Sequence, residues 1–124
     1  MKTISKLLFI FLLITSSSSY AASWEDVTGD DLLNALTDKT WKHKSFTLYY
    51  HSDGTRVVKK KDGKTINDKW TLERDDTIYC IEREGRDKLC AKLQANGKKR
   101  RFEALEGPST GKTWNVKIED GVPE

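Results

Sequence analysis

The sequence predicts a mainly all-β protein, a small antiparallel up-and-down barrel or sandwich of about eight short strands with one short N-terminal helix. Turn signals recur roughly every ten residues after Lys39. The segments between them alternate polar and apolar residues, as half-buried strands do. A single cysteine pair sits in one predicted hairpin, where a disulfide can join its strands.

The start of the chain has the features of a secretory signal peptide, residues 1–22. A basic segment precedes the apolar run from Leu7 to Ile14, and Ala21 and Ala22 suit signal peptidase. The run is much shorter than the about 20 residues of a membrane-spanning helix. We therefore expect one β-rich domain, residues 23–124, that is periplasmic or secreted and has no membrane anchor after cleavage.

Charge argues against a nucleic-acid partner. The chain has 22 basic and 19 acidic residues, a formal net charge of +3. Removal of Lys2 and Lys6 leaves 20 basic residues against 19 acidic ones, so the mature domain is nearly neutral. Such a domain has no overall field that attracts polyanions. We expect no nucleic-acid partner, and we expect a monomer.

A short helix is expected near the new N-terminus. Thr28 and Asp31 resemble a capping box, which marks a helix start. Leu32, Leu33 and Leu36 can then share one face. A helix this short is not stable alone, so it must pack on the rest of the domain.

The strands are expected between the turn signals. Hairpin turns are predicted at Asp53-Gly54, Asp62-Gly63 and Asn96-Gly97, and a longer loop at Gly107–Gly111. Apolar residues alternate in five of the intervening segments: Phe46, Leu48 and Tyr50; Trp70 and Leu72; Tyr79 and Ile81; Leu89, Ala91 and Leu93; Trp114, Val116 and Ile118.

The cysteines test this register. If residues 84–86 form a three-residue hairpin loop, Arg83 opposes Asp87, and counting outward places Cys80 opposite Cys90. An even cysteine count in an exported chain indicates a disulfide. Closing a loop of this length contributes roughly 2 to 3 kcal/mol to stability.

No motif makes a case for an enzyme, a metal or a cofactor. The segment from Gly107 to Thr113 resembles a phosphate-binding loop, but it has three residues between its glycines where the motif needs four, and a strand follows where the motif needs a helix. His43 and His51, the only histidines, have no neighbouring residues that complete a metal or catalytic set. We predict no catalytic residue, no metal site and no cofactor.

Two basic runs, Lys59–Lys61 and Lys98–Arg101, flank predicted hairpin turns. We interpret them as solvated turn flanks, with contact to an acidic partner or the anionic cell envelope as the alternative.

Aromatic residues are numerous for so short a domain, and we interpret most of them as core filling. A barrel of about eight strands is either filled by side chains or holds one small ligand. If a pocket is present, we expect its walls to include four aromatic residues, Tyr50, Trp70, Tyr79 and Trp114.

The chain resembles a group of small exported bacterial proteins of unknown function that are lipocalin-like in form. The shared elements, in order, are Thr40-Trp41, the Tyr-x-x-Asp-Gly-Thr turn of Tyr50–Thr55, Trp70, Cys80 and Cys90. Two residues before Trp70, where such sequences often have glycine, this chain has Asp68. The resemblance implies an exported β-barrel and no particular chemistry.

We therefore expect a non-enzymatic periplasmic small β-barrel binding module for an unknown small ligand or protein partner. One alternative is an inhibitor or protective partner of another protein, which would insert the Gly107–Gly111 loop or the Asn96-Gly97 hairpin into its target. A further alternative, an envelope hydrolase, lacks a visible catalytic cluster.

Overall fold

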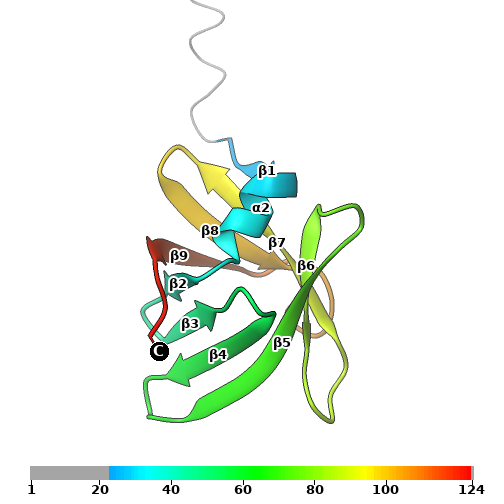
Figure 1. Ribbon diagram of the computed structural model, residues 1–124. Coiled ribbons are helices and arrows are strands. Elements are labelled where there is room, and N and C mark those ends of the chain that lie inside the picture. Colours follow the sequence, from blue (N-terminus) through cyan, green and yellow to red (C-terminus); the bar gives the residue numbers. More distant parts are fainter. Residues whose placement is uncertain (1–22, 124) are drawn as a thin grey trace, which may run out of the picture.

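The computed structural model describes residues 23–123, and the predicted signal peptide lies outside them. The chain forms β1 (Glu25–Val27), the short helix α2 (Gly29–Ala35) and then eight consecutive antiparallel strands (Figure 1). These are β2 (Lys39–Lys42), β3 (Phe46–Tyr50), β4 (Thr55–Lys60), β5 (Thr65–Glu73), β6 (Ile78–Glu82), β7 (Leu89–Asn96), β8 (Lys99–Ala104) and β9 (Thr113–Asp120).

The sheet closes on itself, so the fold is a barrel and not a sandwich. Each strand from β2 to β9 pairs with the next, and β9 returns to pair with β2, with Trp41 opposite Ile118. β1 is an extra strand that pairs with the end of β7 where β6 has already stopped. Closure removes most of the exposed edge that an open sheet of this size would present.

The chain turns near every predicted turn, but the residues differ. The Asp-Gly turns are longer than two residues, and the turn predicted at Asn96-Gly97 lies one residue later, because Asn96 pairs with Lys99. His51 and Thr55 close one three-residue loop, in which Asp53 accepts a hydrogen bond from the backbone N–H of Thr55. Gly54 has φ of +92°, and Asp53 is not among the residues with positive φ. The β4–β5 turn repeats this arrangement around Asp62. In each Asp-Gly pair only the glycine adopts a positive φ, so only that position depends on the conformational freedom of glycine.

The helix closes one end of the barrel (Figure 1). Leu32 and Leu36 are completely buried and pack in the same core cluster as Trp41. The indole N–H of Trp41 donates a 2.8 Å hydrogen bond to the carbonyl of Ala35, which fixes the last turn of α2 on the barrel. The expectation that the helix must pack on the rest of the domain is confirmed.

Two details of the predicted helix are wrong. Thr28 is the N-cap residue, but its side chain makes no capping hydrogen bond, so no capping box forms. Leu33 is 41% exposed, because a seven-residue helix on a barrel end buries only the narrow stripe that Leu32 and Leu36 occupy.

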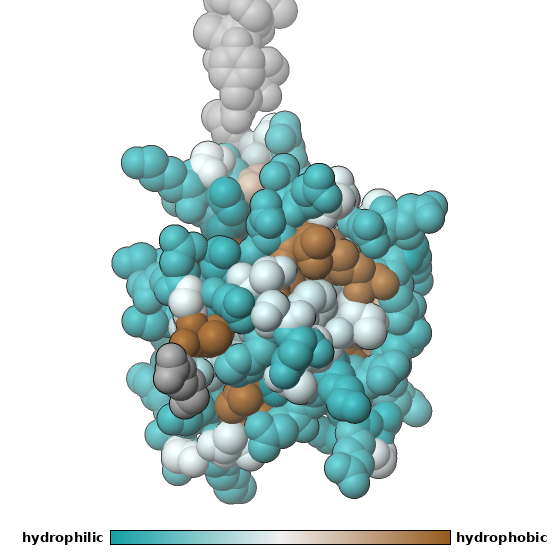
Figure 2. All heavy atoms as spheres, viewed as in Figure 1, coloured by the Kyte–Doolittle hydropathy of each residue, from teal (hydrophilic) through white to brown (hydrophobic). Residues whose placement is uncertain are grey.

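The disulfide forms as the register predicts. Cys80 and Cys90 are direct partners on β6 and β7, and their sulfur atoms are bonded. The bond lies on the outer face of the sheet, where Ile78 and Leu105 cover it. Elsewhere the view in Figure 2 is mostly hydrophilic, with a few separate hydrophobic patches. No helix within residues 23–123 is long and apolar enough to cross a membrane.

Candidate functional site

The barrel has two unlike ends, because the connections of an up-and-down barrel alternate between them. The end beside α2 carries the β3–β4, β5–β6 and β7–β8 turns. The opposite end, here called the open end, carries the β2–β3, β4–β5, β6–β7 and β8–β9 connections.

The open end leads into a pocket of about 630 Å³. This volume lies within the range of roughly 300–1,000 Å³ that is typical of small-molecule sites. The walls are mainly apolar and come from six of the eight strands, with Phe46, Leu48, Val58, Ile81, Phe102 and Trp114 among them. The rings of Phe102 and Trp114 are stacked with their centroids 5.0 Å apart. Both side chains are only partly buried, so they present apolar surface to the cavity.

The inner limit of the pocket is polar. Tyr79 and Arg56 line it, and Arg56 holds the carboxylate of Asp68 through two 2.8 Å hydrogen bonds, from Nε and Nη2. The Asp68 side chain is 1% exposed and that of Arg56 is 14% exposed, so this is a buried ion pair. The remaining nitrogen, Nη1, donates a long 3.5 Å hydrogen bond to the hydroxyl of Tyr50.

Burial and neighbouring groups shift the pKa values of Tyr50, Tyr79 and Arg56. Burial is the main cause that raises the pKa of Tyr50 and of Tyr79 above the ordinary value of 10.0, so both hydroxyls stay neutral. Burial alone would lower the pKa of Arg56, but the neighbouring Tyr50 and Asp68 outweigh it and raise that pKa. The inner limit of the pocket therefore holds one fixed positive charge beside one carboxylate.

Behind this polar layer, aromatic rings separate the pocket from the helix. The ring of Trp41 lies 4.6 Å from that of Tyr50 and 5.6 Å from that of Tyr79. All three side chains are almost completely buried. The prediction of an aromatic core therefore describes the helix half of the barrel, and the open half is hollow.

The four predicted wall residues separate into two pairs. Tyr79 and Trp114 line the open-end pocket. Tyr50 contributes only through its hydrogen bond with Arg56 and is otherwise core. Trp70 does not line this pocket. Its indole N–H instead donates a 2.9 Å hydrogen bond to the carbonyl of His51, which closes the β3–β4 turn on β5.

Residues that the sequence interpretation did not assign to the site are Arg56, Asp68 and Phe102. In the structure Arg56 lies opposite both Tyr50 and Asp68, because the two Asp-Gly loops have three residues each. Counting from two-residue Asp-Gly turns would have placed Arg56 opposite His51 and Lys69, so finding this cluster from the sequence required the correct loop length.

A second hollow of about 860 Å³ lies beside α2, at the other end of the molecule. Asp26, Asp31, Lys39, Lys117 and Asp120 are among the residues that line it. Lys39 contacts Asp120 at 3.5 Å, so part of its charge is already paired. Its lining is more polar than that of the open-end pocket, and this makes it a weaker candidate for an apolar ligand.

No known protein family, curated protein or solved structure matches the chain. The resemblance to small exported lipocalin-like proteins thus stays a prediction. The function has to be argued from the geometry of the barrel.

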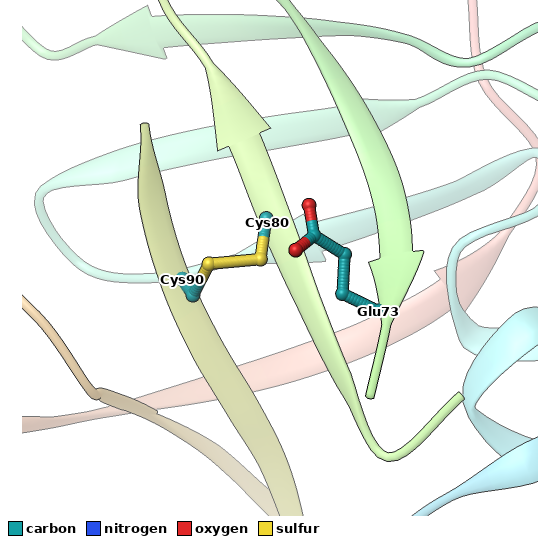
Figure 3. A group of neighbouring side chains, drawn as sticks. All are labelled: Glu73, Cys80 and Cys90. Carbon is teal, nitrogen blue, oxygen red and sulfur yellow. A yellow bond between two sulfur atoms is a disulfide. The ribbon is translucent and has the colours of Figure 1, made fainter. Parts of the chain in front are cut away.

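One group of potential metal ligands lies on the outer face of the barrel. Figure 3 shows the Glu73 carboxylate beside the bonded sulfurs of Cys80 and Cys90. Cysteine binds a metal as the thiolate, and neither sulfur is a thiolate while the two are bonded to each other. Both Glu73 carboxylate oxygens accept 2.9 Å hydrogen bonds from Lys88 Nζ. While the disulfide is intact, this group supplies only an already paired carboxylate.

The two histidines lie at opposite ends of the barrel. His43 belongs to the β2–β3 connection and His51 to the β3–β4 turn, and the five residues of β3, about 16 Å of extended chain, separate them. Nδ1 of His43 accepts a 3.0 Å hydrogen bond from the backbone N–H of Ser45. Burial and then Lys44 lower the pKa of His43. The pair cannot bind one metal ion or act together in one catalytic site.

Proposed function

We propose that this protein is a non-enzymatic periplasmic or secreted binding module that holds a small, largely apolar ligand in the open end of its barrel. The observation that carries the proposal is the pocket whose walls include the partly exposed rings of Phe46, Phe102 and Trp114. Covering apolar surface of this kind contributes roughly 25 cal/mol for each Å² removed from water. The closed barrel is compatible with such a module, and its disulfide is compatible with an oxidising compartment.

The close packing of the other half of the barrel indicates that the pocket serves a ligand and is not a region of poor packing. The helix half of the barrel is closed by Leu32, Leu36 and Trp41, which are completely buried. A chain that packs one half so closely would fill the other half with larger side chains if stability were the only requirement. Instead, Ala91 and Ala104 face the open half as direct partners on β7 and β8.

The experiment is a fluorescence titration with N-phenylnaphthylamine, an uncharged apolar probe. Ala91→Phe places a ring in the open-end pocket, and Ala95→Phe is its matched control. Ala95 lies on the same face of the same strand, four residues away, and lines the hollow beside α2. We expect Ala91→Phe to weaken binding at least about tenfold and Ala95→Phe to leave it unchanged.

A second variant protects the test against a misfolded Ala91→Phe. Trp114→Ala removes half of the stacked ring pair from a partly exposed position, so the barrel should still fold, and we expect it too to weaken binding. Loss of binding on Ala95→Phe alone would move the site to the hollow beside α2. The absence of saturable binding to the parent protein would overturn the proposal.

A further inference from the structure

Charge is distributed unequally between the two ends of the barrel. The four connections at the open end contain seven basic and four acidic residues, a net charge of +3. The basic ones, here called the basic rim, are Lys44, Lys61, Lys64, Arg83, Arg86, Lys88 and Lys112. At the other end, α2 and the connections beside it contain six acidic and two basic residues, a net charge of −4. A nearly neutral domain therefore has a positive open end.

Most of the basic rim has no carboxylate partner among the described residues. Lys88 alone makes an ion pair, with Glu73. Arg83 donates its hydrogen bonds to the backbone carbonyl of Asp87, which leaves its charge unpaired. Arg86 lines the pocket and is exposed, and no described carboxylate lies within ion-pair distance of it. These side chains are free to meet a negative group at the pocket entrance.

The inner limit of the pocket, by contrast, has no place for an anion. Two of the three side-chain nitrogens of Arg56 already donate hydrogen bonds to the Asp68 carboxylate, and the pair carries no net charge. A second anion brought to Arg56 would also face the buried carboxylate of Asp68, and like charges repel strongly in an environment of low polarity. An anionic group of the ligand can be neutralised only at the entrance.

We propose that the ligand is an amphipathic anion, which enters with its apolar part first and keeps its acidic group among the side chains of the basic rim. This inference rests on the proposed function, since the apolar part occupies the open-end pocket. The pocket of about 630 Å³ has room for the apolar part of one small molecule. The proposed ligand is a freely diffusing molecule, and binding of the rim to a membrane surface is an outcome of the test.

The test compares two probes that share an apolar body and differ in charge. Anilinonaphthalene sulfonate carries a negative group, and N-phenylnaphthylamine does not. Arg86→Glu reverses one charge of the rim, and Arg74→Glu makes the same change on the β5–β6 turn at the far end. Lys61→Glu, on another connection, is a second rim variant that does not depend on the β6–β7 turn.

We expect the parent protein to bind the sulfonate more tightly than the uncharged probe. Arg86→Glu should weaken sulfonate binding about tenfold at low salt and by much less at about 1 M salt, where the Debye length is roughly 3 Å. Lys61→Glu should act in the same direction. Arg74→Glu should change neither probe by more than about twofold. Lys61 does not line the pocket, so Lys61→Glu should leave binding of the uncharged probe unchanged. Arg86→Glu should weaken binding of the sulfonate more than that of the uncharged probe.

Each contrary result has a distinct meaning. Equal affinity for the two probes, or equal effects of Arg86→Glu and Arg74→Glu, overturns the inference and leaves the proposed function standing. Failure of both probes to bind overturns the proposed function itself. Co-sedimentation with phosphatidylglycerol vesicles that Arg86→Glu abolishes, without binding of either probe, would assign the rim to a membrane surface and also overturn the inference.

Discussion

Removal of one partner from the buried pair of Arg56 and Asp68 should destabilise the barrel far more than removal of a surface charge. In Arg56→Met, the Asp68 side chain would lose its only charged partner while it remains 1% exposed. Breaking a buried pair in this way costs about 3–5 kcal/mol, because an uncompensated charge stays out of water. In a domain of this size that loss corresponds to a fall in Tm of at least about 12 °C.

The pair of Lys42 and Glu119 provides a control of the same chemistry. Its nitrogen and oxygen lie 3.0 Å apart, close to the 2.8 Å of the buried pair, but its side chains are 55% and 36% exposed. Exposed pairs contribute only about 0–1 kcal/mol. We therefore expect Lys42→Ala to lower the free energy of unfolding by less than about 1 kcal/mol.

A double variant separates burial from attraction. Arg56→Met combined with Asp68→Leu removes both charges, so no unpaired charge is left in the barrel. We expect it to be as stable as the parent, or more stable, and clearly more stable than Arg56→Met alone. Urea unfolding of the oxidised protein, followed by circular dichroism, measures all four proteins. A cost of less than about 1 kcal/mol for Arg56→Met would refute the claim that the pair is buried.

Three further predictions concern the disulfide, the helix α2 and the buried hydroxyl of Tyr79. Replacement of Cys80 and Cys90 by alanine should lower the free energy of unfolding in urea by about 2–3 kcal/mol, and a change within about 0.5 kcal/mol would contradict the stabilising role. Leu36→Ala should cost about 2–5 kcal/mol in the same assay, whereas Leu33→Ala on the exposed side of α2 should cost less than about 0.5 kcal/mol; equal costs would mean that α2 does not close the barrel. Burial raises the pKa of Tyr79, so the folded protein keeps a proton that the unfolded chain loses, and stability should be complete below pH 10.0 and fall as the pH rises above it. Unfolding midpoints measured from about pH 8 to about pH 11 should show this fall, and Tyr79→Phe should reduce it.

The local features of this fold were predictable because each depends on a few adjacent residues. The chain turned near every predicted turn, at a glycine with a positive φ. Counting outward from residues 84–86 placed Cys80 opposite Cys90 correctly, although the connection between β6 and β7 is longer than three residues. The alternating segments became strands with the predicted inward faces. Whether the sheet closes depends on the pairing of β9 with β2, two strands that lie far apart in the sequence, and no local pattern encodes that pairing.

The site was predictable only in part, because a pocket depends on what side chains leave unfilled. Tyr79 and Trp114 line the pocket and Trp70 does not, although all three looked alike in the alternating pattern. The difference arises from the contacts of each ring. Trp70 lies against the β3–β4 turn, at the end of the barrel beside α2, where its indole N–H donates a hydrogen bond to the carbonyl of His51. The charge difference between the ends was also hidden, because consecutive turns in the sequence belong to opposite ends of the barrel.

The most direct test of a ligand site in the open end is an amide NMR titration of the oxidised protein with N-phenylnaphthylamine. We predict that the signals that move belong to Ala91, Phe102 and the indole of Trp114, in the open half of the barrel. The signals of Ala95 and Ile118, which line the hollow beside α2, should stay in place. Movement of that second set alone, or of no signals at all, would contradict the account.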